Sequence, residues 1–196
     1  MTRADERARL FVALELPAVV RTELVQWRSE RVAGVSGLRL TAPEALHLTL
    51  CFLGPRPAGE IDAIAGTCSS VVSHRPRPVL ELGEPVWLPR RRPRVLAIEL
   101  GDGPGELAAL QSACAAALAQ RGWYEPERRP FRPHVTVARA AGNARPQPSK
   151  LPAPSPITFV GSTVALMRSR TRPGGAEYER LSAVSLGDRS GRSVTL

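Results

Sequence analysis

The sequence has few of the residues that build disulfide frameworks, metal centres or membrane spans. Its three cysteines are odd in number and have neither CxxC nor Cys/His ligand spacing, so we expect buried, reduced thiols and no metal site. No apolar run approaches the roughly 18 residues that cross a bilayer. The charged first residues lack the apolar core of a signal peptide. These absences favour a cytoplasmic protein, and the length of 196 residues suits one domain spanning 1–196.

Lysine is almost absent, although the chain is strongly basic. Lysine and arginine total 27 against 18 acidic residues, and Lys150 is the single lysine. A net charge of +9 favours a polyanionic partner such as RNA. GC-rich coding explains a chain rich in Ala, Gly, Pro and Arg equally well. The net charge alone therefore leaves the choice of partner open.

One basic segment combines charge with an aromatic ring. Arg90, Arg91, Arg92 and Arg94 follow Trp87 in a stretch that also contains proline. Such a cluster can follow an RNA backbone while the indole stacks on a base. A solvated loop with Trp87 packed in the core is the competing interpretation. Trp87 is kept as a candidate substrate-binding residue.

Histidine is also scarce, and two of the three histidines occur in matching contexts. His47 is followed two residues later by Thr49, and His134 by Thr136, each within a run typical of a β-strand. Residues i and i+2 of a strand point to the same face. Each HxT tripeptide therefore presents an imidazole and a hydroxyl together. This repetition predicts a two-histidine site.

The order of the predicted elements suggests two related halves. Strands are expected around each HxT motif and at 10–16, 38–40, 79–82, 95–100, 157–167 and 178–186. Helices are expected at 18–32, 57–73 and 105–121, and a loop at 141–156. ALEL at 13–16 is echoed by AIEL at 97–100, and each is followed by a helix and an HxT strand. Two related βαβ-type halves would bring the HxT strands together across a pseudo-two-fold cleft. Half-polar strands favour an α+β fold with one solvated sheet face.

Two imidazoles can act as a base and an acid at the same pH, because the ordinary pKa of histidine is near 6.5. The hydroxyls of Thr49 and Thr136 can donate hydrogen bonds to an anionic oxygen. This set suits attack on a phosphodiester without a metal, since neither motif contains a carboxylate. Arg139 would complete a phosphate site, but strict alternation places it on the face opposite His134, so reaching the phosphate requires a bulge or the end of the strand. Arg132 is a second candidate, with a surface ion pair as its competing role.

These residues resemble the 2H phosphoesterase superfamily, whose members carry two H-x-[ST] motifs. The chain is most similar to bacterial and archaeal RNA 2′,3′-cyclic phosphodiesterases, also called 2′-5′ RNA ligase-like proteins. The similarity rests on RLFVALELP at 9–17, LTAPEALHLTLCFLG at 40–54, PRVLAIEL at 93–100 and RPFRPHVTVAR at 129–139. It covers most of the chain.

The resemblance implies a bilobal α+β fold, with mainly antiparallel sheets around a central cleft and helices outside. It implies hydrolysis of RNA 2′,3′-cyclic phosphate ends to 2′-phosphomonoesters without metal or cofactor, and a reverse 2′-5′ ligase activity. By position, His47 and His134 become the acid/base pair, Thr49 and Thr136 the phosphate donors, and Arg139 a phosphate or ribose contact. The partners are RNA ends or cyclic nucleotides, and a monomer is expected. The alternative is an RNA-binding module that does not turn over its ligand.

Overall fold

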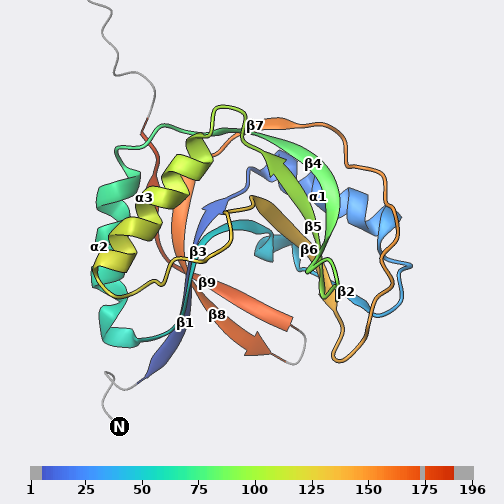
Figure 1. Ribbon diagram of the computed structural model, residues 1–196, viewed down its shortest axis with the longest axis horizontal. Helices are drawn as coiled ribbons and strands as arrows, with labels where there is room; N and C mark the ends of the chain where they lie inside the picture. Colours follow the sequence, from blue (N-terminus) through green and yellow to red (C-terminus); the bar gives the residue numbers. More distant parts are fainter. Residues whose placement is uncertain (1–5, 173–174, 188–196) are drawn as a thin grey trace, which may run out of the picture.

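The computed structural model describes residues 6–172 and 175–187, which form one antiparallel sheet flanked by helices (Figure 1). The strands are β1 (Arg7–Glu15), β2 (Leu38–Leu40), β3 (His47–Pro57), β4 (Val79–Leu88), β5 (Val95–Gly101), β6 (His134–Ala140), β7 (Thr158–Val160), β8 (Thr163–Arg172) and β9 (Gly175–Ser185). The helices are α1 (Ala18–Arg31), α2 (Ile61–Val72) and α3 (Glu106–Gln120), with 3₁₀ turns η1 (Pro43–Ala45) and η2 (Ala58–Glu60). The α+β class is therefore confirmed.

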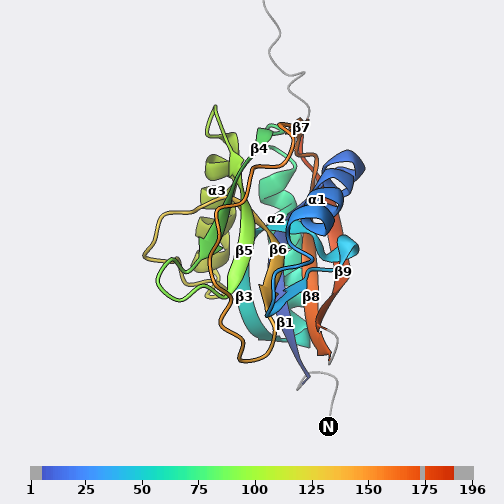
Figure 2. The ribbon, with the colours of Figure 1, turned by 90° about the vertical axis from the view of Figure 1, so that its right-hand side faces the viewer.

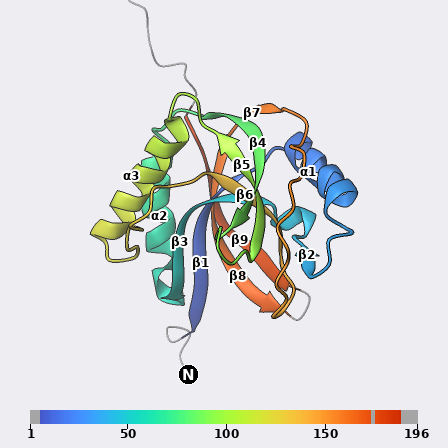
Figure 3. The same cartoon turned by 45° about the vertical axis from the view of Figure 1, so that its right-hand side comes forward.

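The strands follow one another across the sheet in the order β7-β4-β5-β6-β3-β1-β8-β9, and β2 pairs with β6. All of these pairings are antiparallel. The sheet curls, with α2 and α3 packed side by side on one side and α1 on the other (Figures 1 and 3). Figure 2 brings α1 to the foreground, at the outside of the molecule.

The centre of the sheet is a pseudo-two-fold junction between two similar strand pairs. β3 meets β6 at the buried pair Leu48–Val135. On one side of this pair, β3 pairs with β1; on the other, β6 pairs with β5. The cross-strand partners correspond: Glu15 with His47, Glu99 with His134, Ala13 with Thr49, and Ala97 with Thr136. The sequence repeat is thus real, although the βαβ-type label was wrong, because the helix-linked strands run antiparallel.

Two other expectations needed correction. β4 continues to Leu88, so Trp87 lies in a strand rather than in the loop that its proline-rich surroundings suggested. The segment expected as one strand over 157–167 is two strands, separated at Gly161. A Cβ at Gly161 would lie 2.8 Å from Leu14 Cδ2. Because Leu14 is fully buried and has no room to move, this close crossing favours glycine.

The core lies between the helices and the sheet. Val20, Leu24 and Trp27 of α1 are buried, as their helical spacing predicted. The three cysteines are buried and unpaired, and burial raises the pKa of each thiol, which makes them poor nucleophiles. No helix in the described part of the chain is long and apolar enough to cross a membrane.

Candidate active site

The two HxT motifs lie on neighbouring strands at the sheet centre. Leu48 and Val135 are directly paired and point into the core, so the residues that flank them face the other side. Continuing this antiparallel register by one residue sets His47 across from Thr136, and Thr49 across from His134. Directly opposed residues have Cβ atoms about 4.5–5.5 Å apart. The sheet thus gathers two imidazoles and two hydroxyls on one half-buried face.

Both imidazoles are held by the same local hydrogen bond. His47 Nδ1 donates to the carbonyl of Ala45, and His134 Nδ1 donates to the carbonyl of Arg132, each at 2.8 Å. A carbonyl only accepts, so Nδ1 carries the proton and Nε2 holds the lone pair in each neutral ring. His47 Nε2 lies 3.1 Å from Thr49 Oγ1, whose hydroxyl donates to that lone pair. The reactive nitrogen is therefore Nε2 in both motifs.

Aromatic rings distinguish His47 from His134. The centroids of the Phe11 and Tyr178 rings lie 4.8 and 5.0 Å from the imidazole of His47. The pKa of His47 is lowered to about 4, mainly by burial. The bond to the carbonyl of Ala45 opposes this shift, while the positive charge of Arg139 and the interaction with His134 contribute to it. His47 is therefore uncharged at neutral pH in the free protein.

Two β-bulges redirect the residue five positions after each histidine. The pairing of β5 with β6 skips Val137, and the pairing of β1 with β3 skips Leu50. An extra residue in one strand reverses the alternation beyond it. Arg139 and Phe52 are thereby turned to the histidine face. The residues from 47 to 52 and from 134 to 139 have the same order of burial, with two consecutive buried residues at each bulge.

The bulge in β6 turns Arg139 to the same face of the sheet as His134, which strict alternation did not allow. Arg139 lines a cavity of about 310 Å³ together with His47, Arg9, Phe11 and Tyr178, which we call the His47 cavity. Its positive charge also acts on the pKa of His47. The sequence could not place this bulge, because it depends on how β6 pairs with β5.

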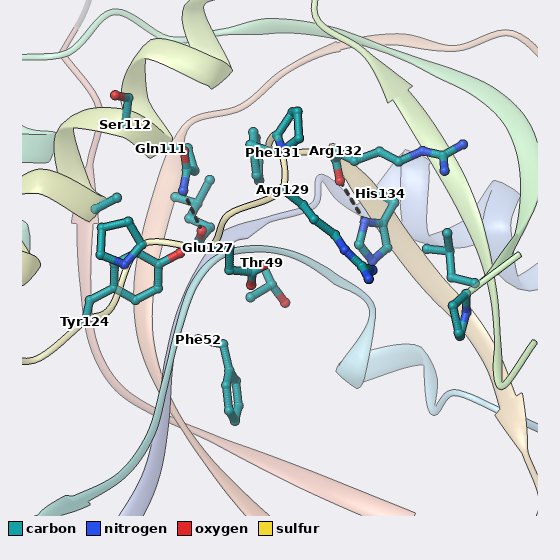
Figure 4. A pocket seen from close by; sticks show the side chains of 16 residues that line it. Thr49, Phe52, Gln111, Ser112, Tyr124, Glu127, Arg129, Phe131, Arg132 and His134 are labelled. Atoms are coloured by element: carbon teal, nitrogen blue, oxygen red, sulfur yellow. Dashed lines mark hydrogen bonds between the residues drawn. The ribbon is translucent and has the colours of Figure 1, made fainter. Parts of the chain in front are cut away.

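A second cavity of about 690 Å³ lies beside His134 (Figure 4). We call it the His134 cavity; it lies between α3 and the segment 124–132, and it is lined by His134, Gln111, Tyr124, Glu127, Arg129 and Phe131 among others. Thr49 and Phe52 line both cavities, which are therefore adjacent. Figure 4 shows Arg129 extending toward His134.

The remaining predicted residues have different surroundings. Arg132 lines the His134 cavity, but its Nε is paired with the carboxylate of Glu99, the ion pair that competed with a role in binding. Trp87 lines neither cavity; it packs against the core, and its indole N–H donates to the carbonyl of Ser149 at 3.0 Å. Arg94 is likewise tied to backbone carbonyls of the loop after β6. Trp87 and Arg94 therefore have no part in the site that we propose.

Sequence reasoning missed several residues at the site. Phe11 and Tyr178 are far apart in sequence, and β1, β8 and β9 bring them together over His47. Tyr178 on β9 pairs with Ser169 on β8, and Ser169 pairs in turn with Arg9 on β1. Arg9 and Phe52 were missed because their contact depends on the bulge at Leu50. The local signal was that each HxT is followed by consecutive apolar residues instead of an alternating pattern.

Metal ligands are not grouped in the described ranges 6–172 and 175–187: no cluster of three or more His, Cys, Asp or Glu side chains there could hold an ion. Many of the groups that line the two cavities are instead cationic, aromatic or hydroxylic. Such groups suit an anion with an attached ring, because arginine and hydroxyls bind phosphate and aromatic faces stack on bases.

The family of the chain follows from comparison with known proteins. The model of the 2′-5′ RNA ligase superfamily matches residues 16–173, most of the described chain. The chain belongs to this superfamily, as the two HxT motifs indicated.

Named relatives and solved structures support the same placement. The chain is 33% identical over 141 residues to the RNA 2′,3′-cyclic phosphodiesterase of Escherichia coli, covering 71% of this chain and 76% of the relative. It is 32% identical over 192 residues to the protein of that name from Thermus thermophilus, covering 94% and 93%. The crystal structure of TT0787 from Thermus thermophilus superposes with a TM-score of 0.80 at 28% identity, covering 91% of this chain and 97% of that one. E. coli LigT complexed with NADP⁺ gives 0.77 at 28% identity, covering 93% and 99%.

Proposed function

We propose that this protein hydrolyses RNA 2′,3′-cyclic phosphate ends to 2′-phosphomonoesters by two-histidine acid/base catalysis without a metal. The observation that carries the proposal is the junction of β3 and β6, where one buried pair sets both HxT motifs on one face beside two cavities. Membership of the superfamily and the names of the relatives point to the same substrate.

The reaction needs one proton removed and one supplied. One Nε2 takes a proton from a water molecule as the water oxygen bonds to phosphorus. The bond from phosphorus to the ribose 3′-oxygen breaks, and the other Nε2, protonated, gives its proton to that oxygen. The products are a 3′-hydroxyl and a 2′-phosphomonoester, and the two imidazoles have exchanged protonation states. Each proton transfer contributes about 10²–10⁴ in rate.

The surrounding donors hold the phosphate during this exchange. The hydroxyls of Thr49 and Thr136 flank the two imidazoles, and Arg139 supplies a full positive charge. When the phosphate is bound, the Thr49 hydroxyl turns away from His47 Nε2, and both hydroxyls donate to the non-bridging oxygens. Donors that are already in position stabilise the charge that develops on these oxygens. The negative charge of the phosphate also opposes the effect of Arg139 on the pKa of His47, so substrate binding makes protonation of His47 easier.

The same geometry supports our proposal of a 2′-5′ ligase activity. If the 5′-hydroxyl of a second RNA replaces water as the attacking group, its oxygen bonds to phosphorus, the bond to the ribose 3′-oxygen breaks, and a 2′-5′ linkage forms with the same two proton transfers. A binding module without turnover is the second candidate, and the basic composition of the chain is the observation that favours it. Cytoplasmic location and a monomeric state stay as predictions.

A defined oligoribonucleotide ending in 2′,3′-cyclic phosphate tests the proposal. The wild-type protein should convert it to the 2′-phosphomonoester, separated from the 3′-isomer by chromatography. His47→Ala and His134→Ala should each lower turnover by at least about 10²-fold. His74→Ala is the matched control, because His74 is an exposed histidine at the end of α2. Thermal melting establishes that each variant is folded.

Two outcomes would contradict the proposal. Undiminished turnover in either motif variant removes that histidine from the mechanism. Tight binding of the RNA with no product in the wild-type protein supports the binding module instead.

A further inference from the structure

The two bulges create a correspondence between Phe52 and Arg139. Each lies five residues after its histidine, and each is turned to the histidine face by an extra residue in the strand. Arg139 lines the His47 cavity, which the first motif faces. Phe52 lines that cavity and also the His134 cavity, to which the second motif contributes His134. Each cavity is thus lined by the residue that lies five positions after the histidine of the other motif: Arg139 in the His47 cavity and Phe52 in the His134 cavity.

Phe52 is unusual among the large apolar side chains of the described residues, because 43% of it is exposed. An exposed aromatic ring that lines two cavities is available to stack on a ligand. Phe52 lies in β3, and it lines both cavities together with Thr49. The guanidinium of Arg9 stacks on its ring, 4.6 Å from the centroid. Arg9 and Phe52 therefore form a stacked pair at the edge between the two cavities.

The His134 cavity has the lining that a nucleoside requires. Its volume of about 690 Å³ is within the range of small-molecule sites. Tyr124 and Phe131 offer aromatic faces, while Gln111 and Glu127 offer an amide and a carboxylate to the edge of a base. Arg129 adds a positive charge at the side nearer His134. The His47 cavity, at about 310 Å³, is smaller and is bounded by Phe11, Tyr178 and Arg139.

We propose that the His134 cavity, entered past Phe52, binds the nucleoside that precedes the cyclic-phosphate end, while the His47 cavity holds the terminal nucleoside. This inference rests on the proposed hydrolysis and extends it to a substrate of at least two nucleotides. The phosphate that links the two nucleosides crosses the edge between the cavities, where Arg9 is placed to neutralise it. The preferred substrate is then an RNA end rather than a cyclic mononucleotide.

The test compares kcat/KM for two substrates, adenosine 2′,3′-cyclic phosphate and a diadenosine that ends in 2′,3′-cyclic phosphate. The ratio of the dinucleotide value to the mononucleotide value is independent of how much of a variant is folded. Stacking of one base changes binding by about 5- to 160-fold. The wild-type ratio should therefore exceed about 5.

Variants of Phe52 locate the effect. Phe52→Leu, which keeps an apolar side chain but removes the aromatic face, should bring the ratio close to 1. Phe52→Tyr should restore it. Val19→Ala is the control, because Val19 is 60% exposed on α1 and lines neither cavity, so the wild-type ratio should persist.

The outcomes separate this inference from the hydrolysis on which it rests. A wild-type protein that hydrolyses both substrates with a ratio near 1 overturns the second subsite and leaves the hydrolysis intact. A ratio that survives Phe52→Leu also overturns it, as does an equal loss on both substrates, which would assign Phe52 to the terminal nucleoside. A wild-type protein that hydrolyses neither substrate refutes the proposed function itself.

Discussion

The aromatic cover of His47 predicts an imidazole that stays uncharged across the physiological pH range. Burial is the main cause of a pKa of about 4 instead of 6.5, with Arg139 and His134 adding to it. A tenfold change in an equilibrium constant is about 1.4 kcal/mol. Protonating His47 in the folded protein therefore costs up to roughly 3 kcal/mol more than in the unfolded chain.

The sign of the effect on stability follows from the two pKa values. The folded protein binds the proton on His47 less tightly than the unfolded chain does, so acid favours unfolding. The stability is fully present above pH 6.5 and falls as the pH is lowered toward 4. His47 is half-buried, and contact with water reduces the loss, so we expect a decrease on the order of 1–3 kcal/mol between pH 7 and pH 4.

Two measurements test this prediction. Heteronuclear NMR can follow each imidazole as the pH changes, because the chain has only three histidines. The signal that disappears in His47→Gln should titrate near pH 4, and Tyr178→Ala, which opens the ring to water, should move that midpoint up toward 6.5. Urea unfolding of His47→Gln should show a smaller loss of stability in acid than the wild-type protein or the His74→Gln control. A midpoint of His47 near 6.5 in the wild-type protein would refute the reasoning.

Three further results are expected from the site, and a fourth from its arginine. The pH profile of turnover should be bell-shaped, because the two imidazoles must be in opposite protonation states, and a flat profile with chemistry rate-limiting contradicts this. EDTA should leave turnover unchanged, whereas strong inhibition that zinc or magnesium reverses would point to a metal-dependent reaction. Thr49→Val and Thr136→Val should each reduce kcat by about 10²-fold as a phosphate donor is lost, and an effect confined to KM would assign these hydroxyls to ground-state binding. Arg139→Gln should raise KM about tenfold, measured in the same assay, and unchanged kinetics would remove Arg139 from the site.

Much of the fold and the centre of the site could be predicted from local patterns. The HxT motifs, the ALEL and AIEL repeat and the three α-helices depend on short-range periodicity, and each is present in the structure. A central pair of strands that join two related halves could also be anticipated. The sequence pattern was enough here because the same arrangement occurs twice in one chain.

The rest depends on pairing between distant strands. Alternation alone turned Arg139 away from His134, and the bulge at Val137 that corrects this arises only when β6 meets β5. Tyr178 reaches His47 through β8 and β9, which no local pattern specifies. Trp87 was misplaced because prolines around it suggested a loop, although β4 accommodates Pro85 at an irregularity of its ladder with β5.

The single pair Leu48–Val135, through which β3 is bonded to β6, has a consequence for tolerance to mutation. The distance between the reactive nitrogens depends on two aliphatic side chains that are buried on the opposite face of the sheet and do not contact RNA. Replacing either residue by alanine would loosen the pairing of β3 with β6. The change in the positions of the imidazoles would impair proton transfer under conditions in which the protein is still folded. Selection for activity therefore extends to the apolar residues on the core face of the sheet.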